Sequence, residues 1–125
     1  MAKWVHDDVL DAALNYIKNN CTRMTACNAQ PTTYLEGNAT FALADVTLAA
    51  GDFTVADDAS GRKNTVAAKA GVLIDVSGTA VYIALLDVSN SKLLYVTSCN
   101  SQVLTAGGGA TVDFPLWKIN IQDPT

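Results

Sequence analysis

The chain has 125 residues, of which 50% are hydrophobic and 16% are charged, and its formal net charge is −4. This balance predicts one folded domain and excludes an intrinsically disordered chain, because burial of the apolar side chains can offset the entropy lost on folding. Only eight Lys and Arg residues are present and they form no run, so no nucleic-acid partner is expected. No segment approaches the roughly 20 apolar residues of a membrane-spanning helix, so no membrane partner is expected either.

The N-terminal segment predicts a short amphipathic helix from Asp7 to about Asn19. Its apolar residues recur with helical spacing on one face: Leu10, Ala13, Leu14, Ile17 and Cys21. Asp7 and Asp8 can cap free N–H groups at the helix start, and Lys18 lies in the last turn. Because the apolar stripe is narrow, we expect the helix to lie along a surface and not to cross a core.

From Cys27 onward, alternation with a period of two replaces the helical period. Such alternation predicts strands in segments 44–48, 53–55, 72–76 and 111–121. Val81 to Leu86 is apolar on both faces, which predicts a central strand covered on each side. A polar break separates it from Lys92 to Thr97, so these two segments predict a β-hairpin. Pro115 indicates a bulge or a sheet edge in the last run.

Short strands separated by turn signals favour a mainly β fold, an antiparallel β-sandwich or small barrel preceded by one N-terminal α-helix. The change of period divides the chain into an N-terminal arm and helix, residues 1–21, and a β-rich domain, residues 22–125. We expect the two parts to form one structural domain overall.

The sequence predicts no catalytic residue, no metal ligand set and no cofactor site. The single histidine, His6, lies beside Asp7 at the helix start, where we interpret it as a solvated residue or a helix-start hydrogen-bonding group. Segment 57–61 lacks the ligand pattern of a calcium loop and is interpreted as a polar turn. Segment 107–109 has three glycines without a phosphate-binding lysine, so it is interpreted as a hairpin tip or flexible loop. We therefore expect a protein that is not an enzyme.

The cysteines favour a reducing compartment. Cys21, Cys27 and Cys99 are odd in number and unevenly spaced, which is a poor disulfide framework and suits buried, reduced thiols. Two of them are six residues apart and the third lies far downstream, so no zinc set with the single histidine is expected. The N-terminus leads into an acidic helix and not into an apolar signal segment, so we expect the protein to stay in the cytoplasm where it is made.

Trp4 and Val5 precede the helix and belong to no periodic element. An aromatic residue in that position either packs on the surface of its own domain or anchors another chain. The same two alternatives apply to the apolar stripe of the helix, which covers either the chain's own sheet or a partner. The candidate protein interface is therefore Trp4, Val5, His6, Leu10, Leu14 and Ile17.

Three segments carry a resemblance to a known class of proteins: MAKWVHDDVLDA at residues 1–12, YIALLDVSNSKLLYVTSC at residues 82–99 and WKINIQDPT at residues 117–125. They resemble small virion structural proteins of tailed bacteriophages. The resemblance extends over nearly the whole chain but includes no residue-level functional motif, so no individual residue role is carried over.

The resemblance implies a capsid decoration or cement protein that binds the major capsid protein or other virion proteins, with a homo-oligomer expected. It also implies a protein located in the virion after synthesis in the bacterial host cytoplasm. A tail or fibre structural subunit is the alternative. A ligand-binding module or an enzyme would instead require a deep pocket with convergent polar groups.

Overall fold

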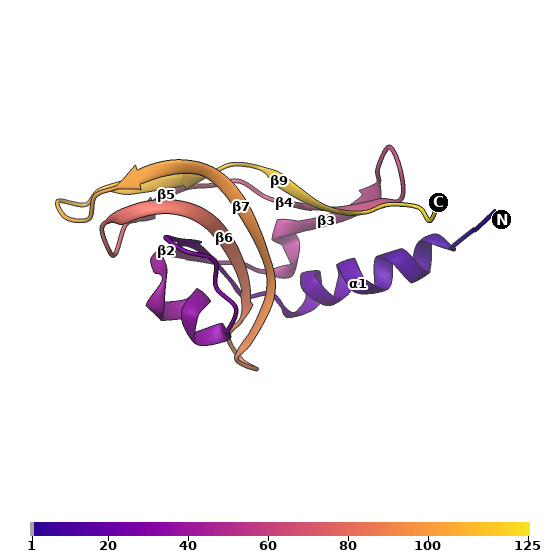
Figure 1. The fold of residues 1–125 in the computed structure, drawn as a ribbon, viewed down its shortest axis with the longest axis horizontal. Helices are drawn as coiled ribbons and strands as arrows, with labels where there is room; N and C mark the ends of the chain where they lie inside the picture. The colour runs from indigo at the N-terminus through magenta and orange to yellow at the C-terminus, as the bar shows by residue number, and fades with distance from the viewer. Residues whose placement is uncertain (1) are drawn as a thin grey trace. The chain divides into compact units, whose positions relative to one another are not determined.

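The computed structural model describes residues 2–125, and Figure 1 shows the course of the chain through its helix and strands. These residues form two units whose segments alternate along the chain. The first unit comprises the segment up to Asn20 together with residues 49–68 and 115–125. The second comprises residues 21–48 and 69–114. This division differs from the expected boundary at residues 21 and 22, because the helix shares its unit with three strands from later in the chain.

The first unit consists of one helix and a three-stranded antiparallel sheet in the order β3-β4-β9. Its elements are α1 (Asp7–Asn20), a short 3₁₀ turn (Ala50–Asp52), β3 (Phe53–Asp57), β4 (Arg62–Val66) and β9 (Trp117–Ile121). The helix packs on β3 and β4. Its Leu14 is 1% exposed, and the core on the sheet side includes Phe53, Val66 and Ile119. Burial of this apolar area is what holds the helix on the sheet.

The helix begins and ends where local hydrogen bonds allow it. At the start, the backbone N–H of Asp8 donates to Nδ1 of His6 at 3.0 Å, and that of Val9 donates to the His6 carbonyl at 3.0 Å. At the end, Nδ2 of Asn20 donates to the Tyr16 carbonyl at 2.8 Å. His6 is thus the helix-start hydrogen-bonding group that its position suggested.

The second unit contains a four-stranded antiparallel sheet in the order β2-β1-β6-β7 and a two-stranded sheet β5-β8. Its elements are β1 (Arg23–Cys27), a π-helical turn (Glu36–Thr40), β2 (Ala42–Thr47), β5 (Lys69–Leu73), β6 (Gly78–Asp87), β7 (Lys92–Leu104) and β8 (Thr111–Phe114). A bridge between Ala44 and Ile74 connects the second sheet to β2. The core of this unit lies along β1, β2 and β6.

The fold is mainly β, with one N-terminal helix and antiparallel sheets, as predicted. The β6–β7 hairpin is confirmed, and Ile83 to Asp87 are all buried in β6, between β1 and β7. No sheet formed by residues 2–125 closes into a barrel, so the barrel alternative is wrong. Segment 57–61 contains the turn between β3 and β4, and segment 107–109 lies in the loop between β7 and β8.

The sequence patterns did not predict β1 and β4, and the single strand predicted at 111–121 is divided into β8 and β9. β1 and β4 lack a long apolar alternation, and β4 has the sequence RKNTV. The expected run 111–121 is interrupted at Pro115 and Leu116, and its halves belong to different sheets and different units. Proline has no N–H to give to a sheet ladder, which explains the interruption.

Candidate interaction surface

The N-terminal arm, which is residues 2–6 before α1, presents an aromatic side chain to solvent. Trp4 is 81% exposed, the highest exposed fraction among the large hydrophobic residues of the described chain. Its ring meets the His6 imidazole edge-on, with 5.9 Å between centroids and 83° between planes. Because His6 also caps α1, this contact ties the orientation of Trp4 to the helix start.

The C-terminal segment of the same unit is held against the β3–β4 turn. Oδ2 of Asp123 accepts a hydrogen bond from the Gly61 N–H at 3.1 Å, and the Asp123 N–H donates to Oγ of Ser60 at 3.3 Å. Gly61 has φ of +76°, and a Cβ at this position would collide with the Ile121 carbonyl. Glycine is therefore required both for the turn and for the close passage of the chain after β9.

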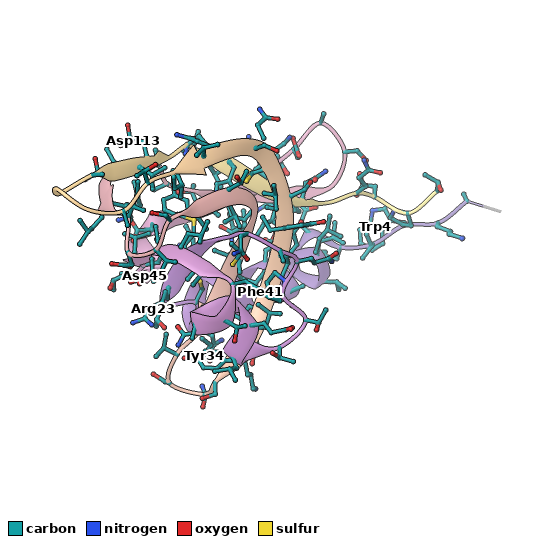
Figure 2. The ribbon with its side chains drawn as sticks, turned by 60° about the vertical axis from the view of Figure 1, so that its left-hand side comes forward. Trp4, Arg23, Tyr34, Phe41, Asp45 and Asp113 are labelled. Atoms are coloured by element: carbon teal, nitrogen blue, oxygen red, sulfur yellow. The ribbon has the colours of Figure 1, made fainter. Side chains whose placement is uncertain are left out.

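A shallow groove lies between the arm and the C-terminal segment, with a volume of about 270 Å³. We call it the arm groove, and its lining residues are Lys3, Trp4, Val5, Asp7, Asp123 and Pro124. Figure 2 shows Trp4 on the arm, beside the C-terminal segment. The groove is open and small, so it fits one side chain of a partner better than a whole small molecule.

Elsewhere in this unit, the carboxylates of Asp11, Asp57 and Asp58 have Arg or Lys partners. Arg62 on β4 binds both oxygens of Asp11 on α1, at 2.7 and 3.1 Å, and donates to Asp57 at 2.7 Å. These hydrogen bonds, that to Asp11 above all, raise the pKa of Arg62. Nζ of Lys118 binds Asp58 at 2.8 and 2.9 Å, which lowers the pKa of that carboxyl. The β3–β4 turn therefore uses its acidic residues for internal ion pairs.

The carboxylates of the arm groove differ in this respect. Among residues 2–125, Asp7 has neither an ion pair nor a side-chain hydrogen bond, and Asp123 uses only Oδ2. Lys3 also lines the groove but lies within ion-pair distance of neither carboxylate. The groove thus combines an exposed indole with two carboxylates whose charge is not neutralised by a direct partner.

The sequence-predicted interface residues are separated by the structure. Leu10 and Leu14 are buried in the core of their own unit, so the stripe of α1 covers the chain's own sheet, as one of the two alternatives expected. Ile17 and Val5 are half-buried, whereas Trp4 and His6 are exposed. Of these six residues, the two that are exposed both lie in the arm.

The groove includes residues that the sequence reasoning assigned no interaction role. Asp7 was identified only as a capping residue, and Lys3, Asp123 and Pro124 were not singled out. No local pattern points to Asp123, because its place depends on a contact with Gly61, 62 residues earlier.

The second unit has an acidic pair on its surface. The carboxyl groups of Asp45 and Asp75 are neighbours, and Nε of Arg23 lies 4.0 Å from Asp45 Oδ1. Figure 2 shows Arg23 and Asp45 in the same region. Partial desolvation raises the pKa of Asp75, and a hydrogen bond with Asp45 and repulsion from its charge raise it further.

Burial raises the pKa of all three thiols of the second unit. Cys21 and Cys27 are buried and Cys99 is half-buried, and none is in a disulfide. Burial raises the pKa of Cys21 to about 11. A thiol with such a pKa is almost wholly protonated at neutral pH and is a weak nucleophile.

Within residues 2–125, no group of three or more His, Cys, Asp or Glu side chains is arranged to hold a metal ion. In the same part of the chain, no helix has the length and apolar character needed to cross a membrane. Comparison with protein-family models, with curated proteins and with solved structures gives no match to this chain.

Proposed function

We propose that this protein is a structural component of a tailed-bacteriophage virion, and specifically a decoration or cement protein that binds the major capsid lattice. The resemblance of residues 1–12, 82–99 and 117–125 to small phage virion proteins supports the class of protein. The observation that carries the adhesive role is the exposure of Trp4. Tryptophan is among the residues that most often dominate binding energy at protein interfaces.

The mechanism is adhesion through many weak contacts. One exposed side chain and one small groove bury too little area for a stable complex between two free proteins. On a capsid the same contact is repeated over the lattice, and oligomers of the protein engage several sites at once. The effective concentration of the second and later contacts then strengthens binding well beyond the single affinity.

Immunogold labelling tests the proposal directly. Antibodies against the purified protein are applied to purified particles of the phage that carries the gene. Antibody preabsorbed with the protein is the control. Many gold particles over the head support a decoration role. Label restricted to the tail or fibres would replace it with the tail or fibre alternative, and absence of the protein from purified particles would overturn the virion proposal.

A binding assay then tests the part played by Trp4. Particles lacking the gene product are mixed with purified protein or with the Trp4→Ala variant, and the bound fraction is measured after sedimentation. We expect the variant to bind more weakly while keeping its melting temperature, because Trp4 contributes little to the core. A variant that binds as well as the parent protein would show that the arm is not the adhesive element.

A further inference from the structure

We propose that the arm groove binds a positively charged side chain, arginine or lysine, presented by a partner polypeptide. Only the location of that partner, in the virion, depends on the proposed function. The chemistry that the groove recognises can be measured on the purified protein alone.

The first argument is the exposed indole. Indole is the strongest cation-binding ring among protein side chains, and it attracts an ammonium or guanidinium group placed over its face. Trp4 already contacts His6 edge-on, and this contact favours the observed orientation of the indole ring. Pre-orientation lowers the entropic cost of binding.

The second argument is the charge of the groove. Asp7 and Asp123 both line it, and the Gly61 N–H holds the Asp123 carboxylate in place through Oδ2, which leaves Oδ1 for another donor. On the neighbouring strands, Arg62 and Lys118 are already bound to Asp11, Asp57 and Asp58. The third base of these strands, Lys63, acts on Asp58 and does not line the groove. The groove is therefore lined by two negative charges, from Asp7 and Asp123, and by one positive charge, from Lys3. This excess of negative charge makes the groove complementary to a cation.

Other occupants fit less well. A phosphate or carboxylate would meet two like charges, which is unfavourable at short distance. A purely apolar side chain would cover Asp7 and Asp123 without supplying a donor, and desolvating a charge without a partner is costly. A guanidinium or ammonium group on an aliphatic stem provides donors for the carboxylates and a cation for the ring.

NMR titration of the purified, ¹⁵N-labelled protein tests the proposal. The probe is the blocked peptide acetyl-Gly-Ser-Arg-Ser-Gly-amide, and the matched control has citrulline, the uncharged isostere, in place of arginine. The indole N–H resonance of Trp4 reports binding, and that of Trp117, which does not line the groove, is the internal reference. We expect saturable shifts at Trp4 with the arginine peptide, with affinity in the millimolar range for one isolated side chain.

Four variants separate the cation site from general charge attraction. Asp7→Asn and Asp123→Asn are each expected to weaken the affinity for the arginine peptide about threefold to tenfold. Asp8→Asn removes the same charge outside the groove, and we expect it to change this affinity less than twofold. Lys3→Ala is expected to tighten binding, because it removes the competing cation. Equal affinity for the arginine and citrulline peptides, or equal effects of Asp7→Asn and Asp8→Asn, would overturn the proposal.

The result is independent of the virion assignment. A positive titration with no label on virus particles would keep the cation site and remove the proposed function. Head label with no arginine binding would keep the proposed function and remove this inference.

Discussion

Replacement of Leu14 by alanine tests whether α1 belongs to the core of its own unit. Leu14 is 1% exposed, and the helix packs on β3 and β4. The substitution removes three buried carbon groups at about 0.8 kcal/mol each, or roughly 2.4 kcal/mol of transfer free energy. A residual cavity adds to this, so we expect the free energy of unfolding to fall by about 3 kcal/mol, within the usual range for buried leucines.

Urea denaturation followed by tryptophan fluorescence measures this loss in the correct part of the chain. Both tryptophans, Trp4 and Trp117, belong to the first unit, so their emission reports its unfolding. The matched control is Val9→Ala on the same helix, where the side chain is 63% exposed. We expect this control to change the free energy of unfolding by no more than about 0.5 kcal/mol.

The comparison of the two variants decides the role of the helix. An equal fall in the free energy of unfolding for the two substitutions would show that the packing of α1 on its sheet contributes little to stability. A fall of less than about 1 kcal/mol for Leu14→Ala would show the same. The stripe would then be free to act as an assembly surface, and the assignment of Leu10 and Leu14 to the core would be wrong.

Three further predictions concern the second unit. Gly37→Ala places a methyl group 3.1 and 3.2 Å from two leucine side chains, so calorimetry should show a loss of about 1–3 kcal/mol. The raised pKa of Asp75 means that the folded state holds its proton more tightly, so this carboxyl lowers stability as pH rises above its unfolded pKa. Asp75→Asn should therefore raise the melting temperature near pH 7 and lose this advantage near pH 3, and a variant less stable at neutral pH would contradict the reasoning. Iodoacetamide should label Cys99 before Cys21 in the native protein, as followed by mass spectrometry, because Cys21 is buried and its pKa is about 11.

The elements predicted from sequence are those whose burial is visible in a short window. Val81 to Leu86 is apolar throughout, and a polar turn follows at once, so the β6–β7 hairpin needs no distant information. The helix is similar, because Leu10 and Leu14 alternate with polar residues at the helical period. In both cases local pattern and final packing agree.

β4 shows why other elements were missed. It is the central strand of its sheet, yet only Val66 is apolar among its five residues. Asn64 is fully buried, and its Nδ2 donates to the Leu14 carbonyl at 3.0 Å. A strand that buries a polar residue against a helix some 50 residues earlier in the chain has no hydrophobic alternation to detect.

The alternation of the units along the chain has the same cause. β9 pairs with β4 and β8 pairs with β5, although only two residues separate β8 from β9. Periodicity describes which side of a segment is apolar, but it does not say which distant strand covers that side. The boundary placed at residues 21 and 22 followed a change of period, whereas the units follow strand pairing.

The arm groove combines both kinds of information, and this explains why only half of it was foreseen. Trp4 stands out in the sequence because it lies outside every periodic element, and its exposure in the structure agrees with that position. Asp123 becomes part of the groove only because the turn at Gly61 accommodates the chain after β9 and binds its carboxylate. Recognition of a cation requires the indole and the carboxylates together. The sequence pattern alone can therefore identify Trp4 as a candidate anchor. The negative charge proposed to select its partner depends on the tertiary structure, which brings Asp123 to the groove.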